Sequence, residues 1–85
     1  MQLIRISAIW CPACLIMRPR VDKLKEIFPS IEHIEYDYDF DDEVKNYNVG
    51  SKLPVFILMD GSCEITRIIG EKSILELETI LKGCI

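Results

Sequence analysis

The sequence predicts an α/β fold in which helices cover both faces of a mixed four-stranded sheet. Two features of the 85-residue chain indicate this fold. The first half alternates strand-like, helix-like and strand-like segments, which is typical of a right-handed βαβ unit with parallel strands. The second half places Asp60-Gly61 between two apolar segments, which is the signature of an antiparallel hairpin. Together these features predict the element order β-α-β-α-β-β-α.

The first three elements are defined by apolar spacing and by prolines. Residues 3–8 predict a buried strand that contains β-branched residues. Pro12 suits the first turn of a helix, where its missing N–H is no loss. Pro19 lies inside the helical pattern and predicts a kink, and Pro29 ends the helix. Residues 31–38 alternate apolar and charged side chains and predict the second strand.

The second half predicts a short helix, a hairpin and a final helix. Residues 39–48 predict a helix that acidic residues open, since these suit a helix N-terminus. Residues 55–59 are continuously apolar, as in a central strand that is covered on both faces. Residues 64–69 predict the return strand.

The last helix has a recognisable start and end. Ser73 and Glu76 have the spacing of a capping box, and Gly83 is placed to end the helix. No linker or repeat interrupts the chain, so residues 1–85 are expected to form a single domain.

Composition and charge exclude several classes of function. The formal net charge is −4, and the Lys and Arg residues are scattered. A nucleic-acid surface or a polybasic membrane contact usually needs clustered basic residues, so neither partner is expected. No apolar run approaches the length of a membrane span, and no secretory signal is apparent. The expected compartment is the cytoplasm.

The main chemical motif is the pair Cys11 and Cys14, which lies between the first strand and the first helix. A helix N-terminus offers free N–H donors and a partial positive charge, and both favour a reactive thiolate. The spacing also occurs in zinc sites, which need four ligands. The other soft ligands are Cys63, Cys84 and His33, and none forms a second close pair. We therefore favour redox chemistry over a metal-holding binding module.

Five short motifs appear in a fixed order along the chain: Trp10-Cys11-Pro12-Ala13-Cys14, Pro19, Leu53-Pro54, Asp60-Gly61 and Gly70. In this order the chain resembles the thioredoxin superfamily over nearly its whole length, and the thioredoxin branch most closely. The resemblance implies the thioredoxin fold and a thiol–disulfide oxidoreductase activity on protein disulfides. It implies no cofactor and no metal beyond the redox-active disulfide Cys11–Cys14.

The resemblance also assigns roles to individual residues. Cys11 would be the nucleophile that forms a mixed disulfide, and Cys14 the thiol that resolves it. Pro54 would follow a cis peptide bond and lie against the two sulfurs, with the Leu53 backbone free to pair with a substrate. An ordinary trans proline at the start of a strand is the alternative for Pro54.

Three further residues are expected to support the active site. Trp10 would provide an apolar contact surface for protein partners, although a packing role suits it nearly as well. Pro12 and Ala13 would tune the redox potential through the geometry of the helix start. The implied partners are protein disulfides and a reductase of the thioredoxin-reductase type or glutathione, with the chain acting as a monomer.

The sequence departs from the thioredoxin pattern at positions that set thiol chemistry. Pro12-Ala13 replaces the usual Gly-Pro, and a proline directly after the first cysteine is more typical of glutaredoxins. A glutathione-dependent, glutaredoxin-like enzyme is therefore the alternative function. Arg5 stands where typical thioredoxins carry a buried acid, six residues before Cys11. We favour an ion-paired strand residue at the protein's edge for Arg5 over a role in supporting the thiolate.

The remaining polar and sulfur-containing residues are expected to be structural. Cys63 shares strand parity with Ile65 and Ile69, which predicts a side chain on the core side. Cys84 is expected to be a free thiol near the C-terminus, and His33 an exposed strand residue. The acidic run of residues 35–43 is expected to be a solvated surface.

Overall fold

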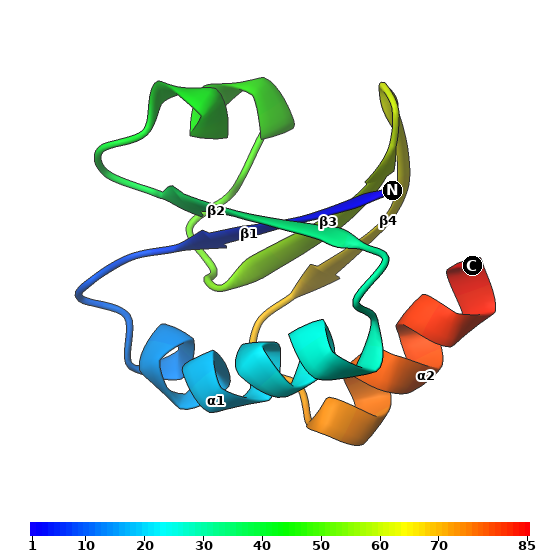
Figure 1. The fold of residues 1–85 in the computed structure, drawn as a ribbon. Helices are drawn as coiled ribbons and strands as arrows, with labels where there is room; N and C mark the ends of the chain where they lie inside the picture. The colour runs from blue at the N-terminus through cyan, green and yellow to red at the C-terminus, as the bar shows by residue number, and fades with distance from the viewer.

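A computed structural model describes residues 1–85. The elements are β1 (Gln2–Ser7), α1 (Pro12–Ile27), β2 (Glu32–Asp37), the 3-10 helix η1 (Asp42–Tyr47), β3 (Val55–Asp60), β4 (Cys63–Ile69) and α2 (Ile74–Cys84). The strands form one sheet in the order β2-β1-β3-β4 (Figure 1). β1 and β2 are parallel, whereas β3 is antiparallel to both β1 and β4. The predicted α/β class and element order are confirmed.

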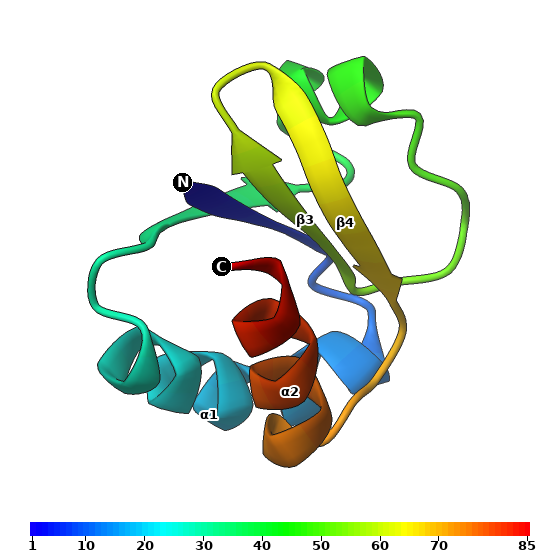
Figure 2. The same ribbon diagram turned by 90° about the vertical axis from the view of Figure 1, so that its right-hand side faces the viewer.

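The two α-helices lie on one face of the sheet, and η1 lies on the other (Figures 1 and 2). The first face buries a cluster of ten apolar side chains from the sheet and the helices: Leu3, Met17, Val21, Leu24, Ile31, Phe56, Leu58, Ile68, Leu77 and Leu81. The opposite face has its own cluster, in which Val44 of η1 packs with strand residues such as Ile4 and Ile57. No helix is long and apolar enough to cross a membrane.

The inner strands β1 and β3 have neighbours on both sides and cover on both faces. Residues 55–58 of β3 are all buried, as the continuous apolar run predicts. Side chains alternate between the two faces along each strand, so one run supplies both clusters. The covered inner strands therefore hold the segments that carry the cysteine pair in fixed positions.

Prolines set the bounds of α1 as predicted. Cys11 is the N-cap, and Pro12 takes the first helical position. The helix continues through Pro19 without a break and ends at Phe28, whose backbone N–H donates to the Leu24 carbonyl oxygen at 2.8 Å. Pro29 follows directly, where it prevents a further helical turn.

The hairpin between β3 and β4 differs from the prediction by one residue. Asp60 pairs with Cys63, so the two-residue loop is Gly61-Ser62 rather than Asp60-Gly61. Gly61 has φ of 64°, a left-handed conformation that glycine adopts without a steric cost. The prediction fails by one step because Asp-Gly suits the turn centre and the turn start nearly equally.

The predictions for the fourth element and for the last element also differ from the structure. Residues 42–47 form a 3-10 helix rather than an α-helix, and Asp41 at its N-cap makes no side-chain capping bond. The Ser73–Glu76 capping box is present, with reciprocal bonds between each side chain and the other residue's backbone. However, Gly83 does not end the final helix, which runs to Cys84.

Candidate active site

The cysteine pair lies where β1 gives way to α1, at the carboxyl end of β1. Four residues after the strand, the Cys11 backbone N–H donates to the Ala8 carbonyl oxygen at 3.2 Å and fixes the turn. Cys11 then caps the helix, since its Sγ accepts the backbone N–H of Cys14 at 3.2 Å. A sulfur that receives a helix N-terminal N–H is stabilised as a thiolate by hydrogen bonding and by the helix dipole.

Both cysteines are buried, each with only 5% of its surface exposed. Cys11 therefore has little contact with solvent in this conformation. Cys11 and Cys14 belong to the same apolar cluster as Leu53 and Val55. This cover arises because the loop before β3 packs against the start of α1. A substrate disulfide must therefore reach Cys11 at the edge of this cluster.

Cys14 is held as a neutral thiol. Burial, and after it the side-chain hydrogen bond with Cys11, raise the pKa of Cys14 to about 11 in total. The Ala8 backbone and Arg5 act the opposite way and lower the pKa of Cys14. Below that pH the protonated form dominates, so Cys14 is a poor nucleophile as long as Cys11 is a free thiol beside it.

The loop before β3 lies next to the cysteine pair. The Leu53–Pro54 peptide bond is cis, and Leu53 is buried in the cluster that contains both sulfurs. The Pro54 carbonyl oxygen accepts the backbone N–H of Gly70 at 2.8 Å. Gly70 has φ of 89°, and a Cβ there would lie 3.3 Å from the Lys52 side chain. Gly70 thus allows the loop and the end of β4 to approach closely.

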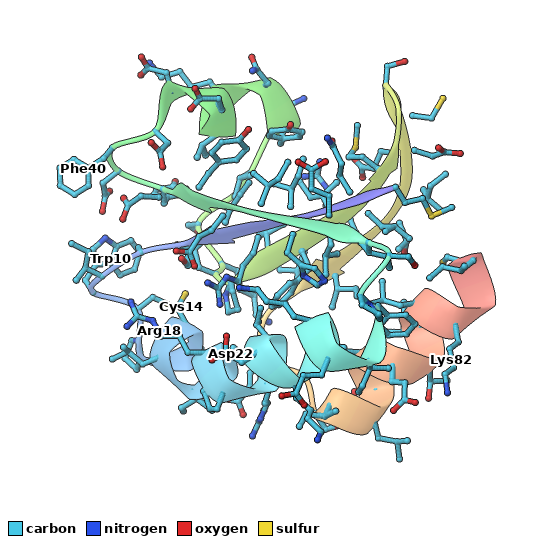
Figure 3. The ribbon with its side chains drawn as sticks, in the orientation of Figure 1. Trp10, Cys14, Arg18, Asp22, Phe40 and Lys82 are labelled. Carbon is cyan, nitrogen blue, oxygen red and sulfur yellow. The ribbon has the colours of Figure 1, made fainter.

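Trp10 is exposed beside the cysteine pair and contacts the loop that follows β2. Its ring Nε1–H donates to Asp39 Oδ2 at 2.6 Å, and the ring meets Tyr38 edge to face at 6.3 Å between centroids. Trp10 remains 59% exposed, and Phe40 on the same end of the molecule is 75% exposed (Figure 3). Trp10 therefore presents apolar surface at the site rather than packing into the core.

Sequence reasoning missed Asp39, which was expected to be part of a solvated acidic surface. The signal lay in the topology: β1 and β2 are parallel neighbours, so the segments after their carboxyl ends meet at one edge of the sheet. The Tyr38 N–H donates to the Ser7 carbonyl oxygen at 2.8 Å and continues this pairing past the strands. Asp37 Oδ1 accepts the N–H groups of Asp39 and Phe40, which shapes the loop.

We expect Asp39→Ala to release the Trp10 ring without unfolding the protein. Trp10 is the single tryptophan of the chain, so its emission reports this site directly. Loss of the hydrogen bond should shift the emission maximum to the red and speed quenching by acrylamide. Asp42→Ala is the matched control, because Asp42 carries the same charge at the start of η1, and its exposed side chain pairs with Lys45. Equal spectra for Asp39→Ala and the parent would contradict the assignment.

Arg5 is ion-paired, as expected, but it does not lie at the edge of the sheet. Its guanidinium pairs with Glu35 of the neighbouring strand β2. β1 is an inner strand, because β3 pairs with its other side. The Arg5 side chain is only 15% exposed, and burial lowers its pKa from the usual range. An arginine in such a position is nearly always paired.

The other candidate residues lie away from this site. Cys63 is exposed and Cys84 is half-buried against the helix-side core, and all four cysteines are free thiols. His33 is half-buried rather than exposed, and its Nε2 is a buried atom without a hydrogen-bond partner. No group of three or more His, Cys, Asp or Glu side chains is arranged to hold a metal ion.

Comparison with known proteins identifies the family. The thioredoxin family model matches residues 1–83. The chain belongs to the thioredoxin family. Among curated relatives, it is 32% identical to thioredoxin H2 of Arabidopsis thaliana over 71 residues, which is 82% of the chain and 53% of the relative. It is 27% identical to thioredoxin-1 of Saccharomyces cerevisiae over 63 residues, which is 74% of the chain and 61% of the relative.

Solved thioredoxins share the fold. Mitochondrial thioredoxin 3 from Saccharomyces cerevisiae, in its oxidised form, superposes with a TM-score of 0.84 at 27% identity, covering 96% of the chain and 76% of that protein. The reduced Schistosoma mansoni thioredoxin pre-protein superposes with a TM-score of 0.85 at 26% identity. The match covers 99% of the chain and 78% of that protein. The chain spans between half and two thirds of the length of the curated thioredoxins that it matches.

Proposed function

We propose that the chain is a thiol–disulfide oxidoreductase of the thioredoxin type that reduces protein disulfides. The single domain of residues 1–85 would carry the reaction on Cys11 and Cys14. The observation that supports this most directly is the cysteine geometry. Cys11 caps α1, and its Sγ accepts the Cys14 N–H at 3.2 Å. Cys14 is a buried thiol one turn along the helix. Membership of the thioredoxin family supports the same chemistry.

The proposed reaction has two exchange steps. The Cys11 thiolate attacks one sulfur of a substrate disulfide, a Cys11–substrate bond forms, and the other substrate sulfur leaves as a thiol after taking up a proton. The Cys14 thiolate then attacks Cys11 Sγ, and the remaining substrate sulfur leaves. The substrate disulfide is reduced to two thiols, and the protein dithiol is oxidised to the Cys11–Cys14 disulfide.

The two cysteines act in order because their environments differ. In the mixed disulfide Cys11 is no longer a thiol or a thiolate, so it no longer raises the pKa of Cys14 by hydrogen bonding or by charge. Burial still raises the pKa of Cys14, but the contributions of Cys11 that raise it in the free dithiol are gone. The resolving thiol is thus restrained until Cys11 has reacted.

Five residues are proposed to support these steps. Trp10 offers apolar surface to a protein substrate, and Leu53 and Pro54 line the approach to the sulfurs. Pro12 and Ala13 occupy the first helical turn, where they set the local geometry around both thiols. No cofactor is needed beyond the Cys11–Cys14 disulfide, since the dithiol itself carries both electrons.

A separate reductant must return the disulfide to the dithiol. We propose a flavoenzyme of the thioredoxin-reductase type, with glutathione as the alternative, and a reducing cytoplasm as the compartment. The family assignment favours the flavoenzyme, whereas Pro12 after the first cysteine favours glutathione. Following the oxidation of NADPH, either with the flavoenzyme alone or with glutathione and glutathione reductase, would distinguish the two. The chain is proposed to act as a monomer.

The proposed function is tested by reduction of insulin in the presence of dithiothreitol. The parent should accelerate precipitation of the insulin B chain, and Cys11→Ser should fall to the rate of dithiothreitol alone. Cys63→Ser is the matched control, because Cys63 is an exposed thiol on β4. Equal rates for the parent and Cys11→Ser would refute the proposal.

A further inference from the structure

One largely buried charged side chain, that of Arg5 on β1, faces α1. Arg5 follows Leu3 on the same face of β1, because side chains two apart on a strand share a face. Leu3 packs with Met17 and Val21 of α1, so this face of β1 is turned toward the helix. Arg5 also shares the lining of a small cavity with Val21. The Arg5 guanidinium therefore lies between β1 and α1.

Cys14 lies on the buried side of α1 with Met17 and Val21, and Arg18 and Asp22 follow it along the adjoining exposed flank of the helix. Cys14, Arg18 and Asp22 are four residues apart, and such residues are neighbours on one side of a helix. Figure 3 shows the three following one another along α1. Each of them affects the pKa of Arg5: Arg18 lowers it, whereas Asp22 and Cys14 raise it. In turn, the charge of Arg5 favours the Cys14 thiolate.

Two carboxylates face Arg5, those of Asp22 on α1 and Glu35 on β2, and both residues are more exposed than Arg5. Glu35 of β2 is its ion-pair partner, but the Glu35 side chain is 51% exposed, whereas that of Arg5 is 15% exposed. A charge near solvent is screened more strongly than a buried one. His33 of β2 and Lys25 of α1 line the same cavity, and neither is an anion. From β3 the neighbour is Phe56, which carries no charge.

We propose that Arg5 is a positioning residue for the resolving step, in which its buried positive charge stabilises the Cys14 thiolate that attacks Cys11. This inference rests on the proposed function and extends it. A guanidinium stays protonated at all ordinary pH values, so Arg5 cannot take the proton of Cys14. That proton goes to water, and the departing substrate thiolate takes one up from water. The atoms and electrons are those of the two-step exchange described above.

The first experiment measures the ionisation of Cys14 alone. In a Cys11→Ser, Cys63→Ser, Cys84→Ser background, Cys14 is the only thiol, and its rate of alkylation by iodoacetamide is followed against pH. Adding Arg5→Met should move the profile toward higher pH by about half to one unit, so that alkylation slows about three- to tenfold at a fixed neutral pH. Arg5→Lys keeps the charge and should restore most of the parent rate.

The matched control is Arg67→Met, which removes an ion-paired arginine from β4 at the opposite side of the sheet. It should leave the Cys14 profile unchanged. Coincident profiles for Arg5→Met and the parent background would overturn the inference, as would an Arg5→Lys profile displaced as far as that of Arg5→Met. A merely structural role for Arg5 predicts this second outcome, because lysine cannot reproduce the guanidinium geometry.

The second experiment measures the resolving step itself. With Cys63 and Cys84 replaced by serine, the reduced protein is mixed with 5,5′-dithiobis(2-nitrobenzoate) in a stopped-flow instrument. Cys11 releases the first thionitrobenzoate, and attack by Cys14 releases the second. Arg5→Met should slow only the second release, by about the same factor as the alkylation. Unchanged second release would overturn the inference alone, whereas a parent that releases only one thionitrobenzoate would overturn the proposed function with it.

Discussion

Replacing Cys14 with serine is expected to trap the protein on its substrate as a stable mixed disulfide. Cys11 can still attack, because its position as the α1 N-cap depends on the Cys14 backbone N–H and not on the Cys14 side chain. A serine hydroxyl does not ionise at neutral pH and cannot displace a thiol from sulfur. Turnover of insulin should fall steeply, since the intramolecular exchange step is lost and only release by dithiothreitol remains. A covalent complex should appear on a non-reducing gel.

Two controls make this outcome specific. The double variant Cys11→Ser, Cys14→Ser should form no complex, and dithiothreitol should release the complex formed by Cys14→Ser. Cys84→Ser should turn over insulin like the parent, because Cys84 lies at the end of α2 against the helix-side core. Normal turnover by Cys14→Ser would show that a solution thiol resolves the intermediate and would remove Cys14 from the mechanism.

Local signals were enough to predict most of the fold. The bounds of α1 depend on Pro12 and Pro29, which act within one turn of the chain, and the structure places the helix between them. The capping box of α2 is equally local, because Ser73 and Glu76 satisfy each other's backbone N–H groups. The apolar run of β3 predicted a covered strand because an inner strand buries both of its faces.

The orientation of β4 was not predictable from alternation alone. Met59 pairs with Glu64 while Leu58 pairs with Thr66, so Ile65 has no partner and a β-bulge interrupts the strand. A bulge reverses the side-chain alternation on one side of it. Cys63 is exposed at the hairpin end of β4, contrary to the prediction, and Ile65 and Ile69 of this edge strand are exposed as well. Nothing in the local sequence reports a bulge, because it depends on the pairing with β3.

In the candidate site, too, contiguous motifs were predictable, whereas contacts between distant residues were not. The cysteine pair and Pro12 form a contiguous motif, and the structure places them at the start of α1 as the sequence predicts. The contacts of Trp10 with Asp39 and of Arg5 with Glu35 join residues about thirty positions apart, and both depend on β1 and β2 being parallel neighbours. The register of that pair brings Arg5 opposite Glu35, and no local pattern encodes a register.

The largest expected loss of stability comes from Phe56→Ala. Phe56 is 1% exposed in the inner strand β3 and packs in the cluster that joins the sheet to both helices. Truncation of a buried phenylalanine costs about 3–5 kcal/mol, because it removes apolar burial and leaves a cavity. The free energy of unfolding of a native protein is about 5–15 kcal/mol, so the variant should lose a large part of it.

Urea unfolding followed by far-ultraviolet circular dichroism measures this loss, and Phe40→Ala is the matched control. The two variants remove the same side chain, but Phe40 is 75% exposed on the loop after β2. Surface substitutions of this kind change the free energy of unfolding by less than about 0.5 kcal/mol. Similar midpoints for Phe56→Ala and Phe40→Ala would mean that Phe56 does not anchor the helices to the sheet. A lower midpoint for Phe56→Ala alone would locate the stabilising core beneath α1, on the same side of the sheet as Arg5.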